Sequence, residues 1–378
     1  MREISVGIIG YGFMGRAHTF GYVTLPLYYE PAPVKVRKLV MCTTSDRNAA
    51  AAEATGYYHA VIRDWQQLIA DPSIDVVHIC TPNSLHHDML AAAICAGKCI
   101  FCDKPVTATW DQARRLRELI EQTNYVRTNQ MHMNARFFPA TMRAKQLADE
   151  GRLGDVLSFR FRQLHATNVD PQKPVNWKSD KTIGGGGVIL DLGSHVIDLA
   201  THLLGPIRRI LCRTDNFTPV RPDGRGGLRK VEAEELAIMI VELENGAVGT
   251  LEVSKVATGT NSELQFEIHG RRGAMRFDMM RPNWLGFYDN TDPETPQGGT
   301  RGFKDIDCVQ HYPSPGGKFP PAKVAGGWLR PHVQSLHNFL AAVADDRQAE
   351  PSLLRGIEIQ RYLDLAYRSA ESQTWQNA

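Results

Sequence analysis

The sequence predicts an α/β Rossmann domain with a parallel sheet, followed by an α+β domain with a large, open-faced and mainly antiparallel sheet. Strand-like and helix-like segments alternate over residues 1–128, which is typical of a parallel sheet. A glycine-rich turn directly follows the first strand, and after residue 129 longer strand-like runs replace the alternation. Since 378 residues exceed the ~100–200 of one ordinary domain, we expect two domains, at 1–128 and 129–378.

The first domain is expected to contain short, buried strands separated by helices. Apolar runs predict strands at 4–9, 36–42, 76–80 and 99–102. Helical patterns are present at 14–20, 49–54, 65–70, 87–96 and 111–122. The helix 87–96 should end at Gly97, because glycine tolerates the left-handed conformation that commonly closes a helix.

The second domain is expected to be built on longer strands with fewer helices. The patterns predict strands at 157–164, 235–243, 248–256 and 263–269, and helices at 140–150, 188–204 and 333–344. Residues 281–330 contain seven prolines, eight glycines and seven aromatic residues, so we expect an ordered loop. Long loops in compact domains are often functional, and we interpret this one as a lid or substrate wall, or alternatively as an oligomer contact.

Composition excludes several classes of function. Lys and Arg total 43 against 41 Asp and Glu, a balance that offers no electrostatic footprint for nucleic acid or an anionic membrane. No apolar run approaches the ~20 residues of a membrane span, and the first residues carry no secretory pattern, so a cytoplasmic location is expected. Among the seven cysteines, Cys95, Cys99 and Cys102 are clustered, but no second Cys-x-x-Cys accompanies Cys99 and Cys102 to form the paired knuckles of a zinc site, and no metal is expected.

The motif Gly10-Tyr11-Gly12-Phe13-Met14-Gly15 predicts a dinucleotide site because it lies between a strand and a helix. Gly10 allows the tight turn, Gly12 lets the backbone approach a pyrophosphate, and Gly15 permits close packing of helix on strand. Phe13 and Met14 open the helix, whose first amides and dipole favour phosphate.

The end of the second predicted strand leaves the choice between NAD and NADP open. An acidic residue that binds the adenosine ribose is usual there, but the position falls near Thr43. The hydroxyls of Thr43, Thr44 and Ser45, together with Arg47, are suited to a 2′-phosphate, whereas Asp46 suits the ribose if the turn is one residue longer. Simple helix capping is the alternative explanation for these hydroxyls.

Two further segments carry candidate chemistry. Lys104 follows a parallel strand at its carboxyl end, where open α/β sheets bind ligands. Asp191 and His195 follow four glycines at an i, i+4 spacing that places both on one helix face. Histidine suits a general base because its unperturbed pKa of ~6.5 lies near working pH. A structural histidine is the alternative, and a metal stripe with Asp198 and His202 is disfavoured.

Together these segments resemble the Gfo/Idh/MocA oxidoreductase family over nearly the whole chain. The similar motifs are the glycine turn, Thr81-Pro82-Asn83 with His86, Asp103-Lys104-Pro105, residues 134–139 (NARFFP), and Asp191-Leu192-Gly193-Ser194-His195 with Asp198. Asp103 replaces the family's glutamate and Ala135 its usual tyrosine. Flanking segments are most similar to the branch that contains levoglucosan dehydrogenase and the glycoside 3-dehydrogenases.

The motifs and the resemblance give a complete set of expected site residues. The expected catalytic group is Lys104, Asp191 and His195. The expected cofactor residues are Gly10, Gly12, Phe13, Met14, Gly15, Thr43, Thr44, Arg47, Thr81, Asn83, His86, Asp103 and Lys104. The expected substrate residues are Lys104, Asn134, Arg136, His165, Trp177, Lys178, Asp191 and His195.

The resemblance implies an NAD- or NADP-dependent dehydrogenase whose cofactor is either released at each turnover or retained by tight binding. Its substrate would be a secondary ring hydroxyl of a sugar or glycoside, most simply at C3. A homodimer or homotetramer formed through the exposed sheet face is implied by family analogy. Two alternatives stay open: a redox-assisted glycosidase of the same fold, and a non-catalytic sensor that binds NAD(P) and a sugar.

Overall fold

The computed structural model describes all residues 1–378, which divide into two compact units. The first unit contains Met1–Phe137, Tyr312–Pro321 and Trp328–Gln360. The second contains Phe138–His311, Ala322–Gly327 and Arg361–Ala378.

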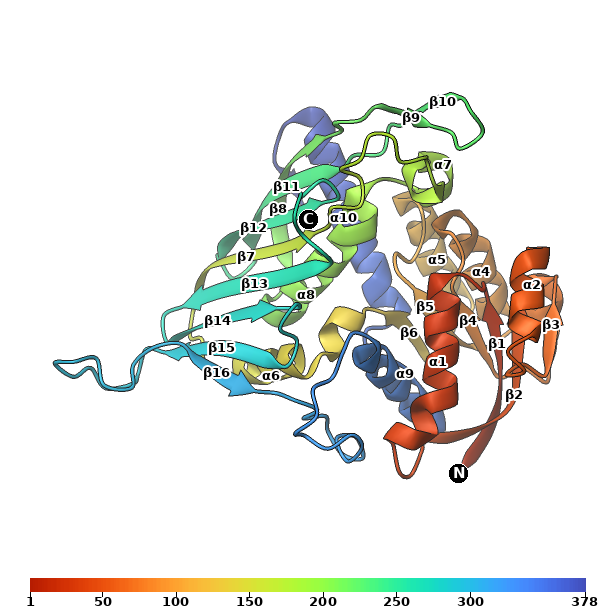
Figure 1. Ribbon diagram of the computed structural model, residues 1–378, viewed down its shortest axis with the longest axis horizontal. Helices are drawn as coiled ribbons and strands as arrows, with labels where there is room; N and C mark the ends of the chain where they lie inside the picture. The colour runs from red at the N-terminus through yellow and green to blue at the C-terminus, as the bar shows by residue number, and fades with distance from the viewer. The chain divides into compact units, whose positions relative to one another are not determined.

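The first unit is built on a six-stranded parallel sheet with the strand order β3-β2-β1-β4-β5-β6 (Figure 1). Its strands are β1 (Arg2–Ile9), β2 (Val34–Cys42), β3 (Ala60–Ile62), β4 (Val76–Ile79), β5 (Cys99–Asp103) and β6 (Asn129–His132). This order, with its reversal between β1 and β4, confirms the predicted Rossmann sheet. The sixth strand lies just beyond residue 128, where the sequence pattern placed the end of the domain.

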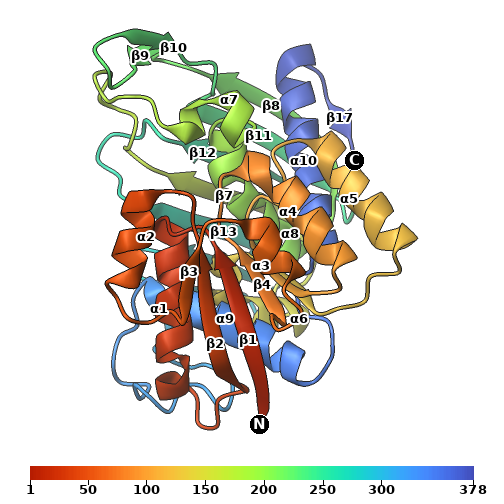
Figure 2. The same cartoon turned by 90° about the vertical axis from the view of Figure 1, so that its right-hand side faces the viewer.

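Helices cover both faces of this sheet. They are α1 (Phe13–Tyr28), α2 (Asp46–Glu53), α3 (Trp65–Ala70), α4 (His86–Cys95) and α5 (Trp110–Gln122). The contacting series α3, α4 and α5 covers one face (Figure 2). On the other face α1 packs against α9 (Leu329–Ala344), a helix from the far end of the chain.

The position of α9 differs from the expected domain division, which placed residues 333–344 in the second domain. Val333, Leu336, Phe339 and Leu340 are buried in the same core cluster as Ile4 and other residues of β1. The side chain of Leu336 reaches Gly21 of α1, where a Cβ would lie 3.0 Å from it. Burial of this apolar face explains why the helix belongs to the first unit.

The second unit contains a nine-stranded sheet in the order β16-β15-β14-β13-β7-β12-β11-β8-β17. The strands are β7 (Val156–Leu164), β8 (Ile207–Asp215), β11 (Leu236–Leu243), β12 (Val248–Ser254), β13 (Glu263–Gly270), β14 (Gly273–Asp278), β15 (Trp284–Asp289), β16 (Lys304–Asp307) and β17 (Gln376–Asn377). Only β7 and β12 are parallel neighbours, so the sheet is mixed and mostly antiparallel, as predicted. A separate hairpin pairs β9 (Val220–Pro222) with β10 (Leu228–Lys230).

Two helices, α6 (Pro139–Asp149) and α8 (Ser194–Leu204), contact the strands of this sheet on one side. The expected single helix over 188–204 is interrupted, because Ile189–Gly193 forms one wide π-helical turn before α8 begins. The helical stretch Lys181–Leu204 is long and apolar enough to span a membrane by composition. However, 83% of its most apolar window is buried, as in the core helix of a globular protein.

The remaining helices connect these elements. The four-residue α7 (Lys181–Gly184) precedes the π-helical turn, and short 3-10 turns occur at Asn83–Leu85, Asn134–Phe137 and Trp177–Ser179. The last helix, α10 (Leu353–Ser372), contributes its residues up to Gln360 to the first unit and the rest to the second.

Residues 281–330 do not form a single loop. They include β15 and β16, whose aromatic residues belong to the second unit, whereas residues 312–321 and 328 belong to the first. Within the first unit, Trp328 lies 5.4 Å from the ring of Phe13 and 4.0 Å from that of His332. The aromatic residues of this segment are therefore divided between the two units.

Candidate active site

The glycine turn has the geometry that its three glycines predict. Gly10 has a φ of 109°, and a Cβ on it would lie 2.6 Å from the carbonyl oxygen of Cys80. A Cβ on Gly15 would lie 1.9 Å from the carbonyl oxygen of Gly10. Around Gly12 there is no atom within 4 Å of such a Cβ. Only the middle glycine therefore faces open space, where a ligand can approach the backbone.

The start of α1 fits a phosphate group. Gly12 is its N-cap and supplies no side-chain hydrogen bond to the first amides. Amides left unpaired at a helix start, together with the helix dipole, favour an anion. Phe13 is exposed and Met14 half-buried at this same turn. These residues fit the pyrophosphate of a dinucleotide.

Two residues are notable near the carboxyl end of β2. One is Ser45, which caps α2 as expected, and the other is Arg63, a cation that was not among the expected site residues. Ser45 accepts a hydrogen bond from the amide of Asn48 at the start of α2. Arg63 donates to the carbonyl oxygen of Thr43 at 3.3 Å and pairs with Asp46 at 2.9 Å. Thr44 and Arg47 are exposed beside them. Arg63 escaped notice because it follows β3, twenty residues along the chain.

The loops after β4 and β5 are joined by a buried histidine. The two ring nitrogens of His86 each lie 2.9 Å from a carbonyl oxygen, one of Thr81 and one of Pro105. Burial lowers the pKa of His86 below its ordinary value. Asn83 is also buried, whereas Thr81 is half-buried and bonds the sulfur of Met89 at 3.5 Å. His86 therefore positions the two motif loops relative to each other.

Asp103 occupies the place of the family glutamate and pairs with a histidine of α1. Its Oδ1 lies 2.9 Å from Nε2 of His18, and both residues are buried. Lys104 follows it, half-buried. Asn134 and Arg136 also lie in the first unit, in the buried turn after β6, where the Asn134 amide is 3.3 Å from Nε2 of His332.

The second unit contains a polar cavity of about 230 Å³ beside the start of the π-helical turn. Its volume is below the ~300–1,000 Å³ typical of drug-sized ligands, so it suits a compact molecule. The lining residues are His165, Thr167, Asn168, Lys173, Asn176, Lys178, Ser179, Gly187, Asp191, Leu192, Val231, Ala233, Glu234 and Lys255. Most of them are polar, which suits a ligand with several hydroxyl groups.

The carboxylate of Asp191 is held in this cavity by two lysines. Its Oδ1 accepts from Nζ of Lys178 at 2.8 Å, and its Oδ2 lies 3.1 Å from Nζ of Lys255. The side chain of Lys178 is 44% exposed, whereas that of Lys255 is 10% exposed. Lys255 is therefore the less screened partner, although the sequence analysis did not select it.

The start of the π-helical turn is fixed by Glu234. Its carboxylate accepts hydrogen bonds from the amides of Gly187 and Ile189 and from the hydroxyl of Tyr367. A Cβ on Gly187 would lie 2.3 Å from the carbonyl oxygen of Glu234, and one on Gly186 would lie 2.0 Å from the Tyr367 hydroxyl. At these two positions of the glycine run, the close neighbours belong to the protein.

The loop that contributes Thr167 and Asn168 to the cavity lining is held by a buried ion pair. Arg221 and Glu235 lie 2.8 Å apart with side chains only 2% exposed. Arg221 also donates to the carbonyl oxygens of Asn168 and Asp170, and Glu235 accepts from the Asn168 amide at 3.1 Å. This network positions the wall of the cavity.

The structure groups only part of the expected substrate set. His165, Lys178 and Asp191 line the cavity, and His165 Nε2 lies 3.2 Å from the hydroxyl of Ser262. Trp177 and His195 are absent from the lining. Trp177 is exposed with Nζ of Lys178 5.7 Å from its ring centre, and His195 is half-buried in the first turn of α8.

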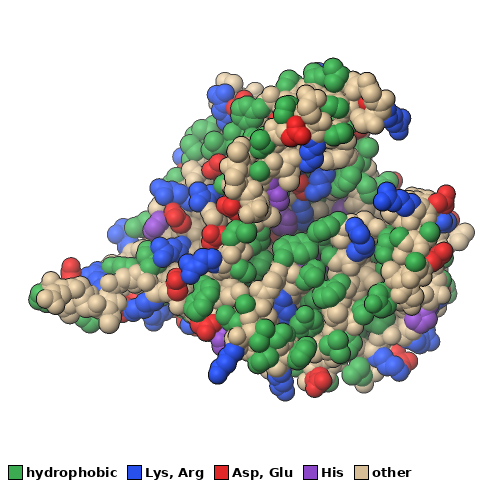
Figure 3. All heavy atoms as spheres, viewed as in Figure 1, with side chains coloured by type: hydrophobic (Ala, Val, Ile, Leu, Met, Phe, Trp, Pro, Cys, Tyr) green, Lys and Arg blue, Asp and Glu red, His purple; other side chains and the backbone are tan.

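Charged side chains of both signs are distributed over one face of the molecule. On the face shown in Figure 3, basic and acidic side chains are interspersed rather than gathered by sign. This distribution agrees with the net charge of +2.

Comparison with known proteins identifies both parts of the chain. Residues 4–130 match the family described as "Oxidoreductase family, NAD-binding Rossmann fold", and residues 141–276 match the "GFO/IDH/MocA C-terminal domain". Levoglucosan dehydrogenase of Pseudarthrobacter phenanthrenivorans is 32% identical, over 99% of this chain and 98% of its own. Inositol 2-dehydrogenase of Rhizobium meliloti is 28% identical, over 64% of this chain and 69% of its own.

Solved structures show the same likeness. A levoglucosan dehydrogenase in complex with NADH superposes with a TM-score of 0.93 at 31% identity, covering 100% of this chain and 99% of that one. The complex with NADH and levoglucosan gives a TM-score of 0.90 at 30% identity and the same coverage. The glycine turn, the uncapped start of α1 and these matches agree in assigning NAD to the first unit. The chain belongs to the Gfo/Idh/MocA family of oxidoreductases and is an NAD-dependent enzyme of its sugar dehydrogenase group.

Proposed function

We propose that the protein oxidises a secondary ring hydroxyl of a sugar or glycoside, at C3, to the ketone. The observation that carries the proposal is the carboxylate of Asp191, held by Lys178 and Lys255 in a compact polar cavity. A carboxylate fixed in this way accepts hydrogen bonds from neighbouring hydroxyls of one ring in a defined orientation. The sugar substrates of the relatives support the same substrate class.

Three residues are proposed to carry the chemistry. His195 takes the proton of the reacting hydroxyl as general base, Lys104 donates a hydrogen bond to the same oxygen, and Asp191 orients the ring. NAD, when bound, supplies the acceptor for the hydride that leaves the carbinol carbon. The donor from Lys104 favours alkoxide character on the oxygen, which lowers the barrier electrostatically. The proton and the hydride together account for the two hydrogens lost from the alcohol.

The experiment measures reduced nicotinamide by its absorbance with levoglucosan, methyl glucosides, free glucose and myo-inositol. NAD, NADP or neither is added to the purified protein. We expect a rise that requires NAD and is largest with glucosides or an anhydrosugar. The position of the ketone in the product is then read by NMR. A product oxidised at another carbon would contradict the C3 assignment, and release of sugar without reduced nicotinamide would favour the redox-assisted glycosidase.

The catalytic assignment is tested with His195→Ala. General acid–base catalysis typically contributes ~10²–10⁴-fold, so kcat should fall by that factor while NADH binding persists. His202→Ala, seven residues further along the chain, is the matched control. Wild-type turnover in His195→Ala would exclude His195 as the base.

A further inference from the structure

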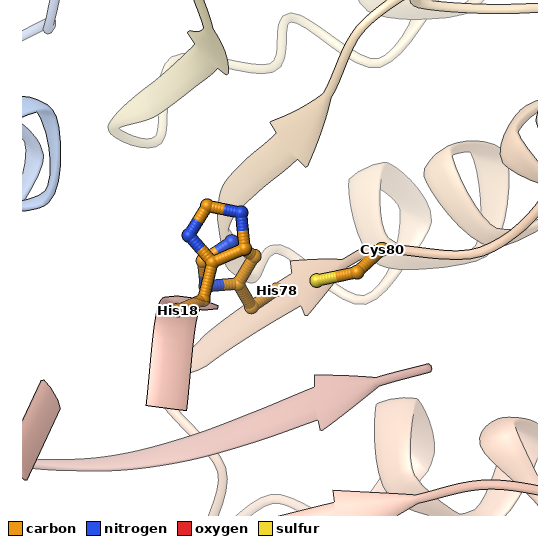
Figure 4. Close-up of side chains that lie close together, drawn as sticks. All are labelled: His18, His78 and Cys80. Atoms are coloured by element: carbon orange, nitrogen blue, oxygen red, sulfur yellow. The ribbon is translucent and has the colours of Figure 1, made fainter. Parts of the chain in front are cut away.

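The first unit contains a cluster of buried metal-ligating side chains that the proposed reaction does not use. His18 of α1, His78 of β4 and Cys80, directly after β4, each offer one ligand atom, and these atoms all lie within 4.8 Å of one another. Figure 4 shows the two imidazole rings beside each other with the sulfur of Cys80 pointing toward them. The ring centres of His18 and His78 are 4.1 Å apart.

His78 is the least explained member of this cluster. Its side chain is completely buried, and neither ring nitrogen has a hydrogen-bond partner in the protein. Its neighbours include the rings of Phe101, at 4.5 Å, and Tyr22, at 5.9 Å. Buried polar atoms are nearly always paired, and an unpaired one in a native fold requires an explanation. A bound cation would provide the missing partner.

A second grouping, of His18, Asp103 and His132, is less suited to a cation. Nδ1 of His132 lies 3.2 Å from the hydroxyl of Ser335, and its Nε2 lies 2.7 Å from Nδ1 of His332. Asp103 is engaged with Nε2 of His18. The donor atoms of the second grouping are therefore already hydrogen-bonded, whereas the first grouping includes His78, whose ring nitrogens have no partner.

We propose that His18, His78 and Cys80 form a binding site for a thiophilic divalent cation of the zinc class. Two neutral imidazoles and a thiolate are the donors that such a cation prefers. Nε2 of His18 donates to Asp103, which leaves Nδ1 for the cation. A carboxylate behind a metal-bound histidine fixes its orientation and raises its basicity.

The charges balance on binding. Cys80 loses its thiol proton to solvent as the sulfur–metal bond forms, so the thiolate and the carboxylate of Asp103 together offset the two positive charges. Burial and the nearby Asp103 and Cys102 raise the pKa of the Cys80 thiol well above its ordinary value. One proton should consequently be released per cation bound.

Binding of the cation requires only small movements of the three ligand atoms. Zn–N and Zn–S bonds of about 2.0 and 2.3 Å place tetrahedral ligand atoms about 3.3–3.8 Å apart. Ligand atoms within 4.8 Å reach this spacing by side-chain movements of about 1 Å.

The experiment uses full-length protein without a histidine tag, stripped with a chelator and titrated with Co²⁺ and then Zn²⁺. A thiolate-to-cobalt charge-transfer band should appear at one equivalent and disappear when Zn²⁺ displaces the cobalt. Calorimetry in two buffers of different ionisation enthalpy should report one proton released per Zn²⁺. Absence of the band in the wild-type protein at millimolar Co²⁺ would overturn the proposal.

Variants assign the ligands. Cys80→Ser should remove the band, and His78→Gln should weaken Zn²⁺ binding at least about 100-fold, beyond the ~10–100-fold of an outer-shell change such as Asp103→Asn. Cys95→Ser and His87→Gln, which alter a cysteine and a histidine outside the cluster, are the controls and should bind like the wild type. Circular dichroism and the NADH affinity show whether each variant is folded.

Three results would contradict the assignment. One is a band that survives in Cys80→Ser, and another is a band that is lost in Cys95→Ser. The third is unchanged Zn²⁺ affinity in a folded His78→Gln. If His78→Gln does not fold, the Cys80→Ser titration alone decides, because Cys80 is half-buried and serine differs from cysteine by one atom.

Discussion

At the scale of single residues, the two lysines that contact the carboxylate of Asp191 differ in how far they are buried. Lys255 is the more buried of the two. It approaches Oδ2 at 3.1 Å from a nearly buried position, whereas the side chain of Lys178 is 44% exposed. Ion pairs in solvent contribute little, and buried ones depend on both partners. The orientation of the Asp191 carboxylate should therefore depend more on Lys255 than on Lys178.

Lys255→Met should lower kcat/KM for the sugar by about 10–100-fold, the loss expected for one charged hydrogen bond of ~1.5–3 kcal/mol. Lys178→Met should have a smaller effect. The measurement is steady-state kinetics at saturating NAD. Lys173→Met is the control, because Lys173 also lines the cavity but its Nζ bonds the carbonyl oxygen of Thr167. Equal rates for Lys255→Met and the wild type would show that Asp191 is oriented by other groups.

His337 makes the stability of the first unit sensitive to acid. Its ring stacks on Tyr29 at 3.9 Å, and burial, followed by the charge of Arg330, lowers its pKa to about 4. The unfolded chain, with a histidine pKa of ~6.5, binds more protons between pH 4 and 6.5. The contribution of His337 is therefore complete above pH 6.5 and is lost as the pH falls toward 4.

The expected loss is about 3 kcal/mol for a shift of this size. In His337→Gln, the free energy of unfolding measured with urea should fall less steeply between pH 6.5 and 4 than in the wild type. His311→Gln, at an exposed histidine, should keep the wild-type slope. Parallel curves for His337→Gln and the wild type would assign the acid sensitivity to other groups.

At the scale of elements, two glycines of the same turn are expected to have different roles. Gly12 should matter for NADH binding, and Gly15 should matter for the stability of the fold. Gly12→Ala adds a methyl group to open space in a conformation that alanine adopts, with φ −81°. It should leave the melting temperature unchanged and weaken NADH binding at least about 10-fold, because the methyl occupies the path of the pyrophosphate. Gly15→Ala places a methyl against the carbonyl oxygen of Gly10 and should destabilise the fold by about 1–3 kcal/mol.

Calorimetric melting and NADH titration of both variants test this difference. The two substitutions are chemically identical and lie three residues apart, so each serves as the control for the other. A stable Gly12→Ala protein with unaltered NADH affinity would show that the cofactor does not pass over this turn.

Elements with strong local patterns were predictable from the sequence. β4 is buried at every position, and the apolar residues Val76, Val77 and Ile79 around its single histidine identified it. β6 (Asn129–His132) was missed because its side chains are polar and find partners far along the chain. Gln130 donates to Ser335 and accepts from Asn338, so its burial depends on a helix about 200 residues away. No local pattern contains that information.

The site was predictable to the extent that motifs defined it. The glycine turn and Asp191 were found because their spacing carries meaning without the rest of the fold. Lys255 and Arg63 were missed, since each is a single cation after a strand, which in a sequence is indistinguishable from a solvent-exposed residue. Only the pairing of β12 with β7 and of β3 with β2 shows what these residues reach.

At the scale of the whole molecule, we propose that the outer face of the nine-stranded sheet joins copies of the chain into a homodimer or homotetramer. Ile238 and Ile240 of β11 are 45% and 40% exposed on this face, and Val248 of β12 lies on the same side. An open sheet face normally carries polar side chains. A group of exposed aliphatic residues is typical of an interaction surface.

Ile240→Glu should convert the assembly into monomers, because a buried carboxylate without a partner opposes association. Size-exclusion chromatography with light scattering gives the mass. Leu228→Glu, at an apolar residue that is exposed on β10, is the control and should retain the wild-type mass. A monomeric wild type, or an unchanged mass for Ile240→Glu, would contradict the use of this face.

The first unit is discontinuous in the chain, and this affects how the protein is made on the ribosome. Its sheet is complete once residue 137 has been synthesised, but α9, which covers one face of that sheet, begins at residue 329. The roughly 190 intervening residues take about 10–40 s at typical synthesis rates. During that time the apolar face of β1 and α1 is without its cover, so the nascent chain should need chaperone protection until release. The N-terminal unit, although its synthesis begins first, therefore cannot complete its fold until nearly the whole chain has been made.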